Sequence, residues 1–324
     1  MERVFPVIHF QYPKSIHLPG LLLQRIFQAL CLLLLLIPAP GTLAKDLTQA
    51  HRIISTSPSI TETLFALGLE DRVVGVTDFC KYPPKACQLA SVGGLVNPHM
   101  ETIVALRPDL VVHLAHSVRL EQNTQKLGIP SMKLEMDTVE NILGSIQLLG
   151  VTLGVEKNAG RLQNKLINGI NLYKKKLKNI PPKEALLLLG DSSDPGRDLY
   201  AAGQGTFLHE LLEISGGRNI IPDSLAQYPK ITKEFIIQKS PEVIIEAGPK
   251  SRLSLEQIKE RMKGWKRFPS IRAVQSEQIH YIGADYILIP GPRLLKILGQ
   301  FSRALHPEIF SDSSPSKTEN KSSP

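Results

Sequence analysis

Cysteine is scarce in this chain of 324 residues, which contains only three. Cys31 lies inside an apolar run near the N-terminus, so only Cys80 and Cys87 remain beyond that run. A structural zinc ion takes four protein ligands, and no further ligands accompany this pair. The scarcity therefore argues against a cysteine-based metal centre.

Motifs for catalysis and nucleotide binding are also missing. The chain has no Walker A loop and no Gly-x-Ser-x-Gly turn. The segment His209–Glu213 has Glu at the position where a zinc protease helix needs its second His. We find no base, nucleophile or metal triad in the remaining sequence. We therefore expect no catalytic residues, no metal site of the protein's own and no resident cofactor.

Positive charge is in mild excess but is not concentrated. Lys and Arg total 38 against 30 acidic residues, which gives a net charge of +8. The densest basic run, Lys174–Lys176, lacks the interleaved aromatic residues of a nucleic-acid surface and is typical of a solvated helix face. We expect no nucleic-acid partner.

The longest stretch of almost wholly apolar residues, Ile26–Ile37, is shorter than the ~20 residues that span a bilayer. It follows Arg25 and precedes small residues that end at Ala44, as in a secretory signal. The pattern predicts a signal peptide over residues 1–44 that is cleaved after Ala44. An uncleaved N-terminal anchor is the alternative. Because Cys31 lies within the run and not after it, the pattern argues against a lipoprotein signal.

Export would place the two remaining cysteines in an oxidising compartment. Cys80 and Cys87 flank a short segment with two prolines, Pro83 and Pro84, which can turn back on itself. We expect a disulfide bond between them, with two free thiols as the alternative.

A repeat is the most informative feature that is present. The twelve residues Glu101–Val112 align without a gap on Glu234–Ile245. Each copy starts with a Glu, continues with apolar residues at helical spacing, breaks at a Pro and ends in an apolar run of strand type. The repeat predicts two similar lobes, each with one surface carboxylate at the same place. Such a pair suits docking on a partner with two-fold symmetry.

Strand and helix patterns alternate through most of the chain, which predicts an α/β fold with mainly parallel sheets. Residues 45–137 form the first lobe of this prediction and residues 181–310 the second. The segment 138–180 has a helical pattern without strand signals and is expected to connect them. The tail 311–324 is rich in Ser, Lys and Pro and is predicted to be disordered. Ser59–Glu62 has the pattern of a helix capping box.

Aromatic residues make up only 6% of the chain, so their placement carries weight. Tyr82, Tyr200 and Tyr286 all fall in predicted loops at strand ends, where a tyrosine can stack on a flat ligand. His116 follows a predicted strand end, where α/β sheets bind ligands.

Several segments, in this order, resemble periplasmic substrate-binding proteins of the ABC importers for cobalamin and iron siderophores. The segments are Ser57–Gly68, Cys80–Pro84, Val92–Gly94, Met100–Val111, Gly216–Asn219 and Ser240–Ile244. The resemblance implies two Rossmann-like lobes joined by a long helix, with the ligand in the cleft between them. It also implies a permease dimer with ATPase subunits as partner, with Glu101 and Glu234 meeting permease arginines.

The loop positions described above and the resemblance together suggest a set of ligand contacts. These are Tyr82, Gly94, His116, Tyr200, Asp285, Tyr286 and Arg293. Gly94 and Leu114 stand where cobalamin-binding members carry Trp, whereas Tyr200 and Tyr286 match aromatic positions.

A corrinoid is thus the first expectation for the ligand, and a ferric siderophore or haem is the alternative. Binding of a metal ion or enzymatic use of the same cleft is the alternative from a different class. We expect a periplasmic monomer.

Overall fold

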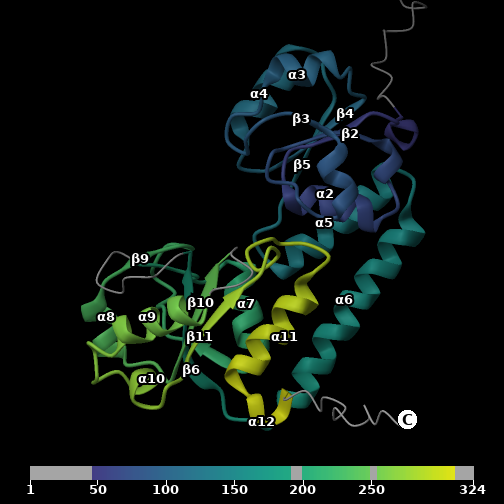
Figure 1. Ribbon diagram of the computed structural model, residues 1–324. Coiled ribbons are helices and arrows are strands. Elements are labelled where there is room, and N and C mark those ends of the chain that lie inside the picture. Colours follow the sequence, from purple (N-terminus) through teal and green to yellow (C-terminus); the bar gives the residue numbers. More distant parts are fainter. Residues whose placement is uncertain (1–45, 191–198, 249–253, 311–324) are drawn as a thin grey trace, which may run out of the picture. The chain divides into compact units, whose positions relative to one another are not determined.

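The computed structural model describes residues 46–190, 199–248 and 254–310 of the 324-residue chain. The predicted signal peptide (1–44) and the predicted disordered tail (311–324) lie outside the described residues. Within the described ranges, no helix is long and apolar enough to cross a membrane. The chain forms two β-sheets with helices packed around them, an α/β fold as the sequence predicts (Figure 1).

Strands and helices alternate along the chain. The strands are β1 (Ile53–Ser55), β2 (Val73–Val76), β3 (Ala90–Ser91), β4 (Leu110–Leu114), β5 (Ser131–Leu134), β6 (Lys183–Leu189), β7 (Leu199–Ala201), β8 (Gly217–Asn219), β9 (Lys230–Ile231), β10 (Val243–Gly248) and β11 (Ile279–Gly283). The α-helices are α2 (Pro58–Ala66), α3 (Met100–Ala105), α4 (Val118–Lys126), α5 (Val139–Thr152), α6 (Glu156–Leu177), α7 (Phe207–Ile214), α8 (Lys233–Lys239), α9 (Leu255–Trp265), α10 (Arg272–Gln275), α11 (Leu294–Leu305) and α12 (Pro307–Phe310). The described part of the chain also contains the 3-10 turns η1 (Leu47–Gln49), η2 (Glu70–Arg72) and η3 (Pro84–Gln88).

The first sheet has the strand order β3-β2-β1-β4-β5, and all neighbouring strands are parallel. Its central strands are buried on both faces. Ile53 packs in the apolar cluster that includes α2, whereas the next residue, Ile54, packs on the opposite side with residues of α3 and α4. A strand that is covered on both faces has a nearly continuous run of apolar residues. This pattern made β1 and β4 recognisable in the sequence.

The second sheet has the order β11-β10-β6-β7-β9, and β8 also pairs with β6. The strands β8, β10 and β11 run parallel to β6, whereas β7 and β9 form an antiparallel ribbon at one edge. The parallel part agrees with the sequence prediction. The ribbon strands are only three and two residues long, too short to show a period of two in the sequence.

Helices α5 and α6 lead from the first sheet to the second. They meet closely where Gly150 faces Ala159, because a Cβ on Gly150 would lie 2.4 Å from the Cβ of Ala159. Buried residues of β1, α5, α6 and β6 belong to one continuous apolar cluster. The two lobes therefore share a core along the connecting helices, and do not meet only through a flexible link.

The two copies of the sequence repeat fold alike, as α3 followed by β4 and as α8 followed by β10. The acidic residue after each proline forms a hydrogen bond with the backbone at the start of the neighbouring central strand. The Asp109 carboxylate accepts a hydrogen bond from the backbone N–H of Arg52 at 3.1 Å, and the Glu242 carboxylate accepts one from that of Glu184 at 2.7 Å. The repeat is therefore a structural unit of each lobe.

One local prediction is wrong. Ser57 and not Ser59 caps α2, and its hydroxyl accepts a hydrogen bond from the Ile60 N–H at 3.4 Å. Pro58 occupies the first turn, where its missing N–H is not needed. Glu62 is therefore not part of a capping box and is available for another role.

Candidate functional site

Arg293 lies at the junction of the two lobes, just before α11, and only 7% of it is exposed. Its Nε donates to the Glu62 carboxylate of α2 at 2.7 Å, and a second guanidinium nitrogen bonds the other oxygen of the same carboxylate. A third nitrogen donates to Asp285 at 2.6 Å. The guanidinium that we predicted to contact ligand is thus bound on three sides by carboxylates of both lobes.

Two of the predicted ligand tyrosines pack against this arginine. The guanidinium carbon of Arg293 lies 4.1 Å from the ring centre of Tyr82 and 5.1 Å from that of Tyr286. Tyr82 belongs to the first lobe and follows β2, whereas Tyr286 belongs to the second and follows β11. Attraction between a cation and an aromatic face holds such a stack together. Arg293 therefore brings one aromatic residue from each lobe to a common point.

Burial and pairing act against each other at this junction. Burial raises the pKa of the Glu62 carboxyl, and the hydrogen bonds and charge of Arg293 limit the rise. Burial also disfavours the charge of Arg293, but the bonds to Glu62 and Asp285 outweigh it and raise the pKa of the guanidinium. A buried ion pair needs such close bonding, because each charge has lost its water.

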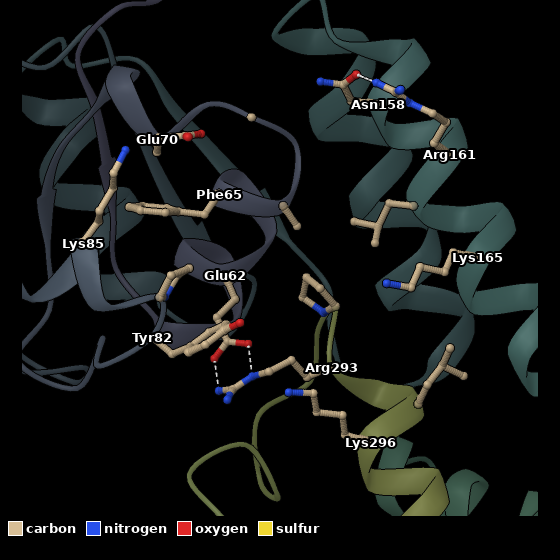
Figure 2. Close-up of a pocket in the computed structure, with 16 residues that line it drawn as sticks. Glu62, Phe65, Glu70, Tyr82, Lys85, Asn158, Arg161, Lys165, Arg293 and Lys296 are labelled. Atoms are coloured by element: carbon tan, nitrogen blue, oxygen red, sulfur yellow. Dashed lines mark hydrogen bonds and ion pairs between the residues drawn. The ribbon is translucent and has the colours of Figure 1, made fainter.

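A hollow of about 900 Å³ adjoins the junction between α2, the segment around Tyr82, α6 and the start of α11 (Figure 2). Its lining is partly apolar, with Phe65 and Leu295 among the residues. Lysines also line it from three sides, and Figure 2 shows Lys165 directed from α6 toward the space before α2. The lysines are Lys85, Lys165 and Lys296. None of the three forms an ion pair within residues 46–190, 199–248 and 254–310. Glu62 and Glu70 also line the hollow, but Glu62 is paired with Arg293 and the lysines outnumber Glu70, so the hollow favours negative charge.

The other predicted contacts lie near the carboxyl ends of further strands. Gly94 follows β3, with no atom within 4 Å of the position that a Cβ would take, and His116 follows β4 and is exposed. Tyr200 pairs with Leu189 at the end of β6 and is 53% exposed. Direct contacts join Tyr82, Tyr286 and Asp285 to Arg293. For Gly94, His116 and Tyr200, a role in ligand binding stays a prediction.

Tyr228 is a further aromatic residue that the sequence analysis did not single out. It is 44% exposed, and exposure alternates along this ribbon, with Pro229 buried and Lys230 exposed. Tyr200 lies opposite Lys230, and the Ala201 N–H donates to the Pro229 carbonyl at 3.0 Å. Successive residues of a strand point to opposite faces, so Tyr200 and Tyr228 share the exposed face. The three residues that precede β9, Gln227 to Pro229, show no strand pattern in the sequence. The exposed position of Tyr228 on this ribbon therefore could not be predicted.

The environment of Tyr228 differs from that of an exposed tyrosine. Partial burial raises the pKa of its hydroxyl, and the negative charge of Asp137 raises it further. Asp137 lies just before α5, in the segment that leaves the first lobe. Its backbone carbonyl accepts a hydrogen bond from the Phe207 N–H of the second lobe at 2.5 Å. Tyr228 therefore lies near a second point where the lobes meet.

Comparison with known proteins decides the family. A family model described as periplasmic binding protein matches residues 53–286, which include both sheets and the Arg293 partners Glu62 and Asp285. The chain belongs to this family. Members are substrate-binding proteins of ABC transporters and not enzymes.

The vitamin B12-binding protein of Salmonella paratyphi A is 28% identical over 285 residues, which cover 87% of this chain and 98% of that protein. The crystal structure of the periplasmic vitamin B12 binding protein BtuF of Vibrio cholerae superposes with a TM-score of 0.68 at 25% identity and covers 82% of this chain and 99% of that one. A periplasmic heme binding protein from Pseudomonas aeruginosa gives 0.69 at 24% identity, over 80% and 93% of the two chains, and shows the shared fold.

In this periplasmic binding protein, Glu101 and Glu234 lie at equivalent places. Each occupies the first turn of its helix, α3 or α8, and each is exposed. The Glu234 carboxylate accepts bonds from its own N–H and from Thr232, which lower its pKa. That carboxylate is therefore held in its charged form, available to a cationic partner.

The predicted disulfide bond is absent from the structure, where Cys80 and Cys87 are free thiols. Cys80 is buried, and its sulfur lies 3.1 Å from the hydroxyl of Thr61 and 3.2 Å from that of Thr77. Cys87 is exposed, and its sulfur faces the carbonyl of Lys81 at 3.5 Å. The buried sulfur is thus engaged by threonine hydroxyls of the core, and the prolines between the cysteines do not bring the two sulfurs together.

Proposed function

We propose that this substrate-binding protein is exported and delivers a corrinoid, or a related flat metal chelate, to an ABC permease. The observation that carries this proposal is that Tyr82 and Tyr286, one from each lobe, both pack on the guanidinium of Arg293. Aromatic rings at strand ends of two lobes are suited to holding a broad, flat ligand. Tyr200 and Tyr228 offer two further exposed aromatic rings on the β7–β9 ribbon of the second lobe.

A corrinoid is the first choice because the arginine at the site is already neutralised. Glu62 and Asp285 bind the guanidinium of Arg293, so it offers little to a strongly anionic chelate. The similarity to the two vitamin B12-binding proteins supports the same choice.

Haem or a ferric siderophore is the second candidate, and the basic hollow favours it. Lys85, Lys165 and Lys296 line a space of about 900 Å³ beside the aromatic residues. Carboxylates of such a chelate would find positive charge there. Tyrosine and histidine are also known axial ligands of haem iron, and Tyr200 and His116 are exposed.

Titration calorimetry with cobalamin, cobinamide, haem and a panel of ferric siderophores tests the proposal. We expect one corrinoid to bind per monomer and Tyr82→Ala or Tyr286→Ala to weaken binding by about tenfold, because each change removes a stacking contact. Replacement of all three lysines, Lys85, Lys165 and Lys296, by Gln is the companion variant. It should leave corrinoid binding unchanged.

Binding of haem or a siderophore alone, with a loss in the lysine variant, would replace the first choice by the second. An absence of heat with every ligand would contradict the chelate class. A visible spectrum of protein purified from its own host provides an independent check, because corrinoids, haem and ferric chelates absorb at different wavelengths.

Delivery is proposed to use the two matched glutamates. Each carboxylate, Glu101 and Glu234, would bind an arginine on one subunit of the permease dimer, where a planar guanidinium can donate two hydrogen bonds to one carboxylate. Export would remove residues 1–44, so the mature protein, a monomer, would begin at Lys45. Intact mass of the protein from the periplasm measures this start directly.

A further inference from the structure

An exposed aliphatic side chain follows each matched glutamate by three residues. Val104 is 46% exposed on α3, and Ile237 is 37% exposed on α8. Residues three apart on a helix are neighbours on its surface. Each lobe therefore presents a carboxylate beside an apolar side chain, from the same position of the repeat.

These aliphatic residues are not the ones that anchor the helices. The preceding residue in each copy, Ile103 or Ile236, points into its lobe and is at most 1% exposed. The burial of the two helices follows the same order, from the exposed glutamate to the buried isoleucine and the exposed aliphatic residue. Val104 and Ile237 thus lie on the outer face, where packing within the lobe does not require an apolar residue.

The two copies have diverged at other outward positions. Ala105 of the first copy aligns with Gln238 of the second, and Arg107 aligns with Ser240. Only the Glu, the buried Ile and the Pro are identical between the copies. An aliphatic side chain has nevertheless been kept on the outer face of both. A single exposed valine needs no explanation, but its recurrence beside the glutamate of each lobe does.

We propose that Val104 and Ile237 are apolar docking contacts that pack on the two permease subunits beside the arginines bound by Glu101 and Glu234. The inference rests on the proposed function, and it names a second component of the same interface. The partner is a dimer whose equivalent subunits each present an arginine next to an apolar surface. Two equivalent sites on one chain match such a dimer, because each lobe can engage one subunit.

The physical role of the aliphatic residues is to exclude water from the ion pairs. An exposed ion pair contributes little, since water and salt screen both charges. Apolar surface that closes over the pair lowers the local dielectric and strengthens the attraction. The apolar contact itself depends weakly on salt, whereas the ion pair depends strongly on it. The apolar contacts and the ion pairs can therefore be distinguished by how binding to the permease depends on salt.

The experiment measures binding of the mature protein to the permease–ATPase complex of its source organism, reconstituted in lipid nanodiscs, by surface plasmon resonance at low and high potassium chloride. Val104→Ser and Ile237→Ser are each expected to weaken binding about fivefold, and the double variant about 25-fold, at both salt concentrations. Glu101→Gln with Glu234→Gln should weaken binding mainly at low salt and flatten the salt dependence.

The control variants alter the same residue types at similar exposure on the connecting helices. Val151→Ser replaces a valine that is 51% exposed on α5, and Ile167→Ser an isoleucine that is 39% exposed on α6. We expect this pair to bind the complex within twofold of the unaltered protein. Val104→Thr with Ile237→Thr, which keeps the branching at Cβ, provides a second variant if the serine pair is unstable.

Unchanged binding of the variants at 104 and 237, with weakened binding of the glutamate pair, would overturn this inference and leave the proposed function intact. Unchanged binding of the glutamate pair as well would overturn the proposed docking itself. Equal losses in the control and test pairs would also contradict the inference, because the effect would then not be local to the two glutamates.

Discussion

Arg107 and Ser240 hold the same left-handed backbone conformation at the same point of the two repeats, with φ of 45° and 44°. Each follows a short helix and precedes a proline and a central strand. In each lobe an arginine donates its Nε to the carbonyl of this residue, Arg52 to Arg107 at 3.3 Å and Arg272 to Ser240 at 2.7 Å. The two lobes therefore make the helix-to-strand turn with the same backbone conformation and the same type of arginine hydrogen bond. Only the residue at the left-handed position differs.

This pair gives a prediction in which the same substitution has different effects on stability at the two positions. Arg107→Gly should stabilise the protein by about 1 kcal/mol, because glycine adopts a left-handed conformation without strain. Ser240→Gly should not, because it also removes a hydroxyl that accepts a hydrogen bond from the Arg272 N–H at 3.0 Å. Urea denaturation of both variants measures the difference. Equal stabilisation by both would show that the Ser240 hydroxyl contributes nothing.

The repeat was visible in the sequence because its signals are local. A glutamate, an apolar pattern, a proline and a β-branched run lie within twelve residues, and each has a direct structural meaning. The fold class followed from the same kind of pattern, repeated along the chain. The partner of Arg293 could not be found in this way, because Glu62 is 231 residues away and its position fits a helix cap equally well. The engagement of the Cys80 sulfur by Thr61 is a long-range contact of the same kind.

The buried ion pair between Arg293 and Glu62 should make a large contribution to the stability of the protein. Glu62→Gln is expected to destabilise the protein by about 3 kcal/mol, because it leaves the buried guanidinium with one carboxylate partner. Arg293→Met combined with Glu62→Leu should recover much of the loss, since no buried charge then remains. Urea denaturation measures the stability of each variant, and comparison of Glu62→Leu, Arg293→Met and their combination gives the coupling.

Glu260→Gln is the matched control for that experiment. Glu260 forms an ion pair with Lys263 in which both side chains are more than 70% exposed. Its replacement should change stability by less than about 0.5 kcal/mol. A loss at Glu62 no larger than the loss at Glu260 would show that the buried pair does not hold the lobes.

Closure on ligand should be small. One apolar cluster passes from β1 through α5 and α6 to β6, and the Arg293 pair adds an ionic link between the lobes. A hinge needs a few residues that are free to change their backbone angles, and this packing leaves little such freedom in the connecting helices. X-ray scattering curves with and without ligand should nearly superpose. A change of several ångströms in the radius of gyration would contradict the shared core.

Tyr228 should lose its proton at a higher pH than a free tyrosine, because burial and the charge of Asp137 both raise its pKa. The folded state then holds this proton more tightly than the unfolded state. Its contribution to stability is present below the unfolded pKa of about 10 and is lost as pH rises through the folded value. Ultraviolet titration of tyrosinate, with Tyr228→Phe to assign the signal, measures the shift. Asp137→Asn should reduce it without abolishing it, and an unchanged titration would exclude Asp137 as a cause.

Charge reversal separates docking from ligand binding. Glu101→Arg and Glu234→Arg should leave ligand affinity and melting temperature nearly unchanged, because both side chains are exposed on helices α3 and α8. Ligand-stimulated ATPase activity and transport should fall with each change and fall further with both, since like charges would then face each other across the interface. Glu156→Arg controls for the loss of a carboxylate from a first helical turn, because Glu156 is exposed at the start of α6. If the control lowers transport as much as the docking pair, the glutamates act through their helices and not through the permease. If the double reversal instead abolishes ligand binding, both glutamates belong to the ligand site.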